Sequence, residues 1–215
     1  IPIGIDINLF PMQTPEMKEN YRRQFKIPKS AFVIGSFQKD GIGWGEGNEP
    51  KLIKGPDIFI NTLRILKSRI PELFVLLTGP SRGYVKAGLE SLKIPYSHYY
   101  CDDYSQIYQY YQTLDAYLVT SREEGGPKAI LESMASGIPL VSTKVGQAQD
   151  LMSNGINGWL SESESSESLA ESILKIFDNN IFDEFIKNKA RFTAINNTYD
   201  SQLGLWNEFF KPLLR

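Results

Sequence analysis

The segment DAYLVTSREEGGPKAILESMASGIPLVST, residues 115–143, has the pattern of one complete strand–helix–strand unit. Residues 115–121 are apolar and partly β-branched, which predicts a buried strand. A Gly-Gly-Pro turn then opens into a predicted helix over residues 127–136, which Gly137 closes as a C-terminal cap. The apolar residues 138–143 predict a second strand. A strand, a helix and a strand in this order predict two parallel strands joined by a right-handed crossover.

The same alternation covers most of the chain. Further strands are predicted at residues 31–37, 73–79 and 96–101, and helices at residues 56–70, 85–92 and 104–114. Continuous apolar strands that alternate with helices are typical of a parallel sheet covered on both faces. The sequence therefore predicts an α/β fold with a doubly wound parallel sheet of the Rossmann-like type.

Both ends of the chain depart from this pattern. Residues 1–30 are apolar and rich in turn signals but precede the first strand, which indicates a connector from an earlier part of the protein. After Leu160, Ser168 and Glu171 fit a capping box at the start of a helix. Two more helices are expected, at residues 181–194 and 201–214. The last is apolar on more than one side, so we expect it either to dock on a missing domain or to pack on its own sheet.

Composition excludes several classes of protein. The 215 residues are 41% hydrophobic and carry a formal net charge of −2, which offers no basic surface to nucleic acid. The single cysteine, Cys101, excludes an internal disulfide and a cysteine-based zinc site. The single histidine, His98, excludes a histidine-built metal site and a Ser-His-Asp triad, and we expect it to be a strand residue. No run reaches the roughly 18 apolar residues of a membrane span, so the cytoplasm is the expected compartment.

The candidate binding site lies in the loops that follow the strands. Doubly wound sheets bind ligands at the carboxyl ends of their strands, where the strand order reverses. The loops at that edge span residues 36–55, 79–83, 101–104, 121–127 and 143–149. The first of these is glycine-rich and longer than a usual strand-to-helix connection, which indicates function or mobility.

The Gly-Gly-Pro turn has the features of an anion site. Gly125 and Gly126 let the chain turn sharply and admit a ligand close to the backbone. Pro127 suits the first helical position, where its missing N–H is not needed. The N–H groups of Lys128 and Ala129 are then free donors at the positive end of the helix dipole, and the Lys128 ammonium adds a full charge. The turn is therefore predicted to bind phosphate.

Two carboxylates flank this turn. Glu132 lies one turn inside the helix, away from its apolar side, and can accept hydrogen bonds from hydroxyls such as those of a ribose. Glu124 precedes the turn, near the far end of a bound diphosphate. Both glutamates could equally be surface residues, since a Gly-Gly-Pro turn needs no ligand.

The ordered motifs of residues 121–160 resemble the C-terminal half of retaining glycosyltransferases of the GT-B fold, in particular glycosyltransferase family four. Glu124 and Glu132 are separated by seven residues, as in the two-glutamate motif of that family. The matching segments that follow are ASGIPLV, Val145-Gly146 and NGINGWL, and those upstream are IPIGID, KGPD, FVLLTGP and DAYLVTS.

This resemblance implies a role for individual residues. Glu132 would bind the ribose hydroxyls of a nucleotide-sugar. Glu124, as a catalytic residue, would contact the hydroxyls of the donor sugar and the developing positive charge. Lys54 matches the family's phosphate-binding lysine and would be the second catalytic residue. The main chain near Tyr100 and Cys101 would read the base.

Two positions depart from the family pattern. The family usually carries an arginine directly after the glycine of the first strand, whereas Ser36 follows Gly35 here. The candidates for the missing charge, beside Lys54, are Lys128, Lys39 and Arg82. Pro127 replaces a frequent glycine and removes one N–H donor. Gly35, Ser36 and Gly79, which lie at the ends of the first two strands, complete the expected donor-binding set.

The resemblance implies the donor-binding domain of a retaining glycosyltransferase that uses a UDP- or GDP-sugar and needs neither a metal nor a further cofactor. Residues 1–30 would be the interdomain linker, residues 31–200 the nucleotide-sugar-binding domain, and residues 201–215 a helix that docks on a missing N-terminal, acceptor-binding domain. This domain alone would turn over little substrate. The full-length enzyme would work in the cytoplasm, at the inner face of the membrane.

Two alternatives stay open at this point. Nucleotide-sugar 2-epimerases share the GT-B architecture, so the same donor site could serve an isomerase. The chain could also be a non-catalytic nucleotide-sugar-binding module that self-associates through the helix at residues 201–215. Products distinguish the first alternative, and oligomeric state distinguishes the second.

Overall fold

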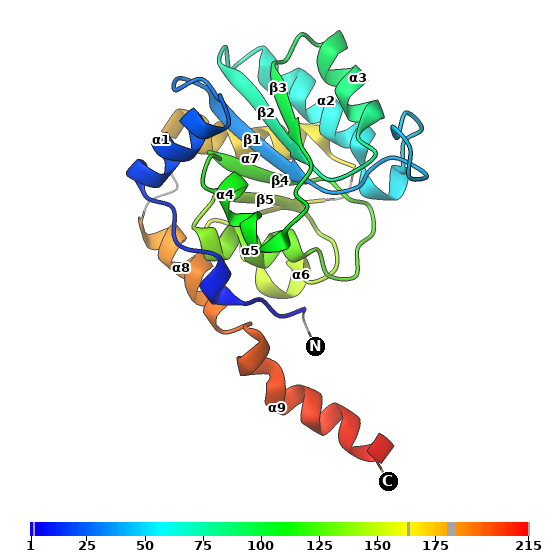
Figure 1. Cartoon of the computed structure of the whole chain (residues 1–215), viewed down its shortest axis with the longest axis vertical. Coiled ribbons are helices and arrows are strands. Elements are labelled where there is room, and N and C mark those ends of the chain that lie inside the picture. The colour runs from blue at the N-terminus through cyan, green and yellow to red at the C-terminus, as the bar shows by residue number, and fades with distance from the viewer. Residues whose placement is uncertain (2, 163, 180–183, 215) are drawn as a thin grey trace.

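The computed structural model describes residues 1, 3–162, 164–179 and 184–214. Within these residues six strands form one parallel sheet in the order β3-β2-β1-β4-β5-β6 (Figure 1). The strands are β1 (Phe32–Phe37), β2 (Leu73–Thr78), β3 (Tyr96–Tyr99), β4 (Ala116–Val119), β5 (Leu140–Thr143) and β6 (Trp159–Ser161). The predicted doubly wound parallel sheet is confirmed. Its strand order reverses between β1 and β4.

Helices cover both faces of the sheet (Figure 1). The α-helices are α1 (Pro15–Gln24), α2 (Pro56–Lys67), α3 (Gly83–Ser91), α4 (Tyr108–Tyr111), α5 (Lys128–Ser136), α6 (Ala148–Leu151), α7 (Ser166–Asn179), α8 (Glu184–Ile195) and α9 (Tyr199–Phe210). One hydrophobic core packs side chains of α4, α5 and α8 on one face. A second core packs α2, α3 and α7 on the other.

Alternation along the strands explains the two cores. Successive side chains of a strand point to opposite faces, so a strand buried on both sides is apolar throughout. In β2, Phe74 and Leu76 join the first core, whereas Val75 and Leu77 join the second. This double burial is the reason that the strands read as continuous apolar runs in the sequence.

Several elements differ from the sequence-based expectation. The connector over residues 1–30 contains α1, capped by Thr14, whose hydroxyl accepts from the Met17 N–H at 3.1 Å. The predicted helix over residues 104–114 is only a 3-10 turn, η3 (Tyr104–Gln106), and the single turn of α4. The short strand β6 and the single-turn α6 were not predicted, because three or four residues carry too little periodicity.

The C-terminal helices also begin elsewhere than expected. The capping box at Ser168 is wrong: the helix α7 starts at Ser166, and Ser165 Oγ accepts from the Ser168 N–H at 3.2 Å. The first predicted residues of the next helix, 181–183, lie outside the described residues, and α8 runs from Glu184 to Ile195. The predicted last helix begins two residues early, at Tyr199.

Helix α9 extends away from the layered part of the molecule rather than packing on its sheet (Figure 1). Its start is fixed by the N-terminal segment, since the Tyr199 N–H donates to the Ile5 carbonyl at 3.2 Å. Large apolar side chains then stay exposed along it and the turn that follows: Leu203, Leu205, Trp206, Phe209, Phe210 and Leu213. Across the described part of the chain, the helices are too short or too polar to span a bilayer.

Candidate functional site

A cavity of about 510 Å³ opens at the carboxyl ends of β1, β2 and β4, where the strand order reverses. Its position is the one at which doubly wound sheets hold ligands. The lining residues expected from the sequence are Lys39, Lys54, Gly79, Glu124, Gly126, Lys128, Ala129 and Glu132. The structure therefore brings together eight predicted residues from four separate stretches of the chain.

The start of α5 forms one wall of this cavity. The helix begins at Lys128, one residue later than predicted, because Pro127 has an extended ψ of 115° and serves as the N-cap. Its first N–H groups therefore lack intrahelical partners. The turn before it needs small residues: a Cβ on Gly126 would lie 2.8 Å from the Ile3 side chain, and Gly146 packs against the Glu124 and Gly125 carbonyls with a φ of +46°.

Lys54 and Glu124 face each other across the cavity mouth. The Lys54 Nζ forms an ion pair with Glu124 Oε1, which also accepts from the Ser121 hydroxyl at 3.1 Å. Gly55 makes this approach possible, because its φ is +62° and a Cβ there would lie 1.9 Å from the Thr120 carbonyl oxygen. The Thr120 hydroxyl donates to the Gly55 carbonyl at 2.9 Å. Close backbone contact between the two loops thus sets the lysine opposite the glutamate.

A second contact locks the same two loops together. The Arg122 guanidinium donates to both carboxylate oxygens of Asp57, at 2.9 and 2.7 Å, and to the Leu52 carbonyl at 2.6 Å. Planar bidentate pairs of this kind fix geometry as well as charge. The hydrogen bonds to Asp57, together with an ion pair to Glu164, raise the pKa of Arg122 above its usual value, and the hydrogen bonds from Arg122 lower the pKa of Asp57.

Glu132 is 6% exposed although it lines the cavity. Its Oε1 accepts from the Tyr104 hydroxyl at 2.6 Å, and its Oε2 accepts from the Tyr111 hydroxyl at 2.7 Å. Burial raises the pKa of Glu132 above its usual value of 4.5, while the two tyrosines and Lys128 oppose that rise. The predicted hydroxyl acceptor is thus in the cavity, and each of its oxygens binds a hydroxyl of the protein.

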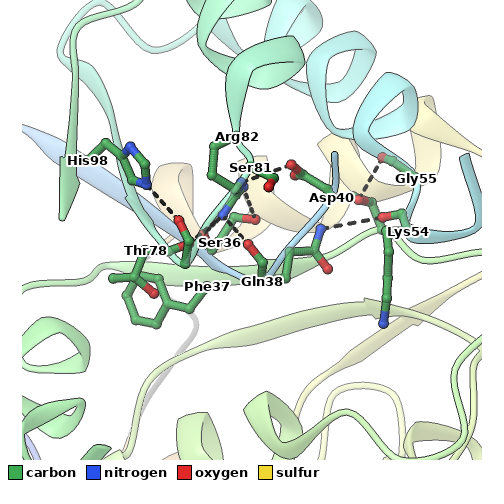
Figure 2. Close-up of polar contacts among 12 residues, drawn as sticks. Ser36, Phe37, Gln38, Asp40, Lys54, Gly55, Thr78, Ser81, Arg82 and His98 are labelled. Carbon is green, nitrogen blue, oxygen red and sulfur yellow. Dashed lines mark hydrogen bonds and ion pairs between the residues drawn. The ribbon is translucent and has the colours of Figure 1, made fainter. Parts of the chain in front are cut away.

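Arg82 does not reach the cavity, in contrast to the sequence-based expectation that it could contact a diphosphate. It is 1% exposed, and its guanidinium points back to the ends of β1 and β2 (Figure 2). It donates to the carbonyls of Ser36, Thr78 and Gln38, at 2.7, 2.8 and 3.0 Å, and to the Ser36 hydroxyl at 3.0 Å. The arginine is therefore a clamp that joins the ends of two strands, and its N–H groups bond to acceptors within the protein instead of to a ligand.

Asp40 completes this clamp. Its Oδ1 lies 3.0 Å from the Arg82 Nε, and the two atoms form an ion pair, although the N–H is not aligned for a hydrogen bond. Burial raises the pKa of Asp40, and the neighbouring Arg82 charge works against that shift. The pair anchors the start of the glycine-rich loop, in which Gly41 and Gly47 pack so closely on the Ser81 carbonyl that a side chain on either would clash.

Other predicted residues also lie outside the cavity lining. Ser36 is 1% exposed beneath Arg82, and Gly35 packs against the Leu114 and Tyr117 side chains. Gly125 lies on the outer side of the turn, and a Cβ added to it would meet no atom within 4 Å. The positions predicted to read a base, Tyr100 and Cys101, follow β3 away from the lining residues, and Tyr100 is 63% exposed.

His98 lies in β3, as expected for a strand residue. Its Nε2 is 2.7 Å from the Gly79 carbonyl oxygen (Figure 2). Burial lowers the pKa of His98, so the ring is neutral at neutral pH. The histidine thus fastens β3 to the loop after β2.

Among the lining residues that were not predicted as site residues are Lys51 and Tyr104. Lys51 lines the cavity because the loop folds back on itself through a bridge between Gly41 and Pro50. Tyr104 lines it because η3 turns the ring toward α5, where the Lys128 Nζ lies 5.0 Å from the ring centroid. The sequence offered one signal for both residues, because each lies in a strand-to-helix loop at the ligand edge of the predicted sheet: Lys51 in residues 36–55 and Tyr104 at the end of residues 101–104.

The sheet order and the cavity at its reversal, lined by lysines, carboxylates and the start of α5, define an α/β domain with a polar cavity at the carboxyl ends of its strands. A family model described as "Glycosyl transferases group 1" matches residues 50–193, more than half of the chain. The chain therefore belongs to the glycosyl transferases group 1 family.

Similar proteins agree with this family. The D-inositol 3-phosphate glycosyltransferase of Corynebacterium urealyticum is 25% identical over 181 residues, which are 79% of this chain and 40% of that protein. The lipopolysaccharide core biosynthesis mannosyltransferase LpsB of Rhizobium meliloti is 27% identical over 164 residues, 71% of this chain and 42% of that protein. The chain thus spans about two fifths of the length of these relatives.

Solved structures share the fold. Anabaena Alr3699/HepE in complex with UDP and glucose matches with a TM-score of 0.76 and 23% identity, over 98% of this chain and 55% of that one. The C-terminal domain of a glycosyl transferase group 1 family protein (LpcC) from Francisella tularensis matches with a TM-score of 0.71 and 19% identity, over 90% of this chain and 97% of that one. The fold is therefore that of GT-B glycosyltransferase structures.

Proposed function

We propose that the chain is the donor-binding domain of a retaining glycosyltransferase, which moves a sugar from a nucleoside diphosphate onto an acceptor during glycan synthesis. The observation that carries the proposal is the cavity in which the start of α5, the Lys54–Glu124 pair and Glu132 face one another. UDP and UDP-glucose are bound by the similar Anabaena protein, which supports a nucleotide-sugar as the ligand here.

The diphosphate would bind at the start of α5. The N–H groups of Lys128 and Ala129, the helix dipole and the ammonium groups of Lys54, Lys39 and Lys51 offer it donors and positive charge. These lysines take over the role of the family arginine, because Ser36 stands at its position and Arg82 is occupied by carbonyls.

Glu132 would bind the ribose and Glu124 the sugar. A carboxylate accepts hydroxyl hydrogen bonds through both oxygens, and the two glutamates flank the turn from opposite ends. As the bond between sugar and diphosphate breaks, negative charge grows on the diphosphate and positive charge on the sugar. The preorganised N–H groups and Lys54 would stabilise the first, and Glu124 the second. Lys54 would exchange part of its contact with Glu124 for the departing phosphate.

The acceptor site would belong to a further, N-terminal domain. Support comes from the two-fifths coverage of the relatives and from the exposed apolar side chains along α9, which we propose to pack on that domain. Trp206 stacks on Phe210 there, and Phe209 meets both rings edge to face, with ring centroids 5.2 to 6.0 Å apart, so the three form one continuous apolar surface.

A thermal-shift screen with UDP, GDP, ADP and their sugar conjugates tests the donor role. A ligand at a hundred times its Kd stabilises a protein by about 2.7 kcal/mol, which for a chain of this length raises Tm by roughly 5 to 11 °C. We expect one diphosphate to do so, and Glu132→Ala to remove most of the shift. Glu171→Ala, which alters an exposed position on α7, is the control. The absence of a shift with every nucleotide would contradict the proposal.

A further inference from the structure

Both oxygens of the Glu132 carboxylate bind tyrosine hydroxyls in this structure. Tyr104 donates to Oε1 at 2.6 Å and Tyr111 to Oε2 at 2.7 Å. A hydroxyl is also what a ribose would present to this carboxylate. A ribose can therefore reach Glu132 only if one of the two tyrosines gives way or shares its acceptor.

The two tyrosines differ in how firmly they are held. Tyr111 is fully buried, and its ring packs edge-on against Phe37 at 4.9 Å and stacks on Tyr117 at 5.4 Å between centroids. Tyr104 is 45% exposed. Among the rings that the structure describes, it contacts only Phe10, edge to face, at a centroid distance of 6.3 Å. Tyr111 is thus a fixed part of the core, whereas Tyr104 can leave at little packing cost.

Space for the displaced ring is present next to it. A second cavity, of about 560 Å³, lies between residues 5–9 and 198–200, and Tyr104 lines both this cavity and the first. Asp6 and Tyr199 line the second cavity and carry polar groups that can partner a phenol. A change of rotamer would move the Tyr104 hydroxyl from one cavity to the other.

The anion site is coupled to the same ring. The Lys128 ammonium lies 5.0 Å from the centroid of Tyr104, within the range of a cation–π contact. A diphosphate at the start of α5 would attract this ammonium and remove its contact with the ring. Binding of the phosphates would thus remove the cation–π contact with Lys128 that helps to keep Tyr104 next to Glu132.

We propose that the Tyr104 hydroxyl is a built-in competitor of the ribose: it satisfies Glu132 in the free protein and turns into the second cavity when a nucleotide binds. This inference rests on the proposed function, since it assigns Glu132 to the ribose. Tyr104 is then a positioning residue that keeps the buried carboxylate oriented and lowers the affinity for the nucleotide. A buried acceptor without a donor is costly, which explains why the free site carries its own hydroxyl.

Calorimetry on Tyr104→Phe with UDP, GDP and their 2′,3′-dideoxy forms tests the inference. The substitution removes a hydrogen bond that the free state has and the ribose-bound state lacks, so the affinity for UDP or GDP rises, about tenfold. The dideoxy forms have no hydroxyl that could replace the tyrosine on Glu132, so their affinity stays unchanged and the ratio between the ribo and dideoxy affinities grows. Tyr111→Phe is the matched control: its hydroxyl stays on Glu132 in both states, so nucleotide affinity does not rise.

The outcomes separate the two proposals. An unchanged or lower affinity of Tyr104→Phe for a nucleotide that the wild-type chain binds refutes the competitor role and leaves the donor role standing. An equal rise for the ribo and dideoxy forms would also refute it, because Tyr104 would then obstruct the nucleotide without competing with its hydroxyls for Glu132. If neither protein binds UDP or GDP, the donor role itself fails, and this inference fails with it.

Discussion

Arg82→Met is the substitution that tests the buried clamp behind the site. Methionine keeps an unbranched stem in the same space but removes every donor. The guanidinium of Arg82 donates to the carbonyls of Ser36, Gln38 and Thr78 at 2.7 to 3.0 Å and lies 3.0 Å from Asp40. The variant therefore leaves three carbonyls and one carboxylate without their buried partner.

The expected loss follows from these contacts. Removal of one partner of a buried ion pair costs about 3 to 5 kcal/mol, and each stranded carbonyl costs about 1 kcal/mol or more. Protonation of Asp40, whose pKa burial already raises, limits the first contribution. We expect the free energy of unfolding to fall by about 4 kcal/mol, which lowers Tm by roughly 8 to 16 °C for a chain of this length.

Thermal and urea unfolding, followed by circular dichroism, measure this loss. Asp40→Asn alone should cost less, because the three carbonyls still surround the guanidinium, and the double variant should lose less than the sum of the two. Arg64→Met, which changes an exposed arginine of α2, is the control and should leave Tm nearly unchanged. A loss of less than about 1 kcal/mol for Arg82→Met would refute the clamp.

Three further results are expected. Burial raises the pKa of Glu132 above 4.5, so the folded chain keeps a proton there that the unfolded chain releases. The free energy of unfolding of the wild type, relative to that of Glu132→Gln, should therefore fall as pH rises from 4.5 through the pKa of Glu132 in the folded chain. Urea unfolding at several pH values measures this difference, and a difference that does not change with pH would disprove the expectation. Lys54→Met should weaken UDP binding by about 1.5 kcal/mol, roughly tenfold in Kd, whereas Lys144→Met, outside the cavity, should not; equal calorimetric affinities would exclude the phosphate role. Glu124→Gln in the full-length enzyme should lower kcat more than it raises KM, and an effect on KM alone would contradict a role in the transition state.

The sheet could be predicted because each strand is buried on both faces. Phe74 to Leu77 alternate between two cores, so every position is apolar and the run stands out. The three-residue β6 and the polar helix α1 offer no such signal. The prediction of one continuous helix over residues 104–114 was wrong, because the tyrosines of this segment have other places in the structure. Tyr111 is buried in the core, and Tyr104 donates a hydrogen bond to Glu132.

The lining of the cavity was predictable where a local motif fixes it. The Gly-Gly-Pro turn, Glu124 and Glu132 lie within nine residues of one another, and the topology places that stretch at the ligand edge. The role of Arg82 was not predictable, because its acceptors lie in β1 and β2, up to 46 residues away in the chain. From the sequence, an arginine in a strand-to-helix loop is equally suited to a phosphate or to three carbonyls.

The central claim is that the start of α5 binds a diphosphate while Glu132 binds the ribose. A crystal structure of the chain with UDP bound measures both contacts directly. The account predicts phosphate oxygens on the N–H groups of Lys128 and Ala129, ribose hydroxyls on Glu132, and the Tyr104 hydroxyl withdrawn from Oε1. UDP bound elsewhere, or bound with its ribose away from an unchanged Tyr104–Glu132 hydrogen bond, would contradict it.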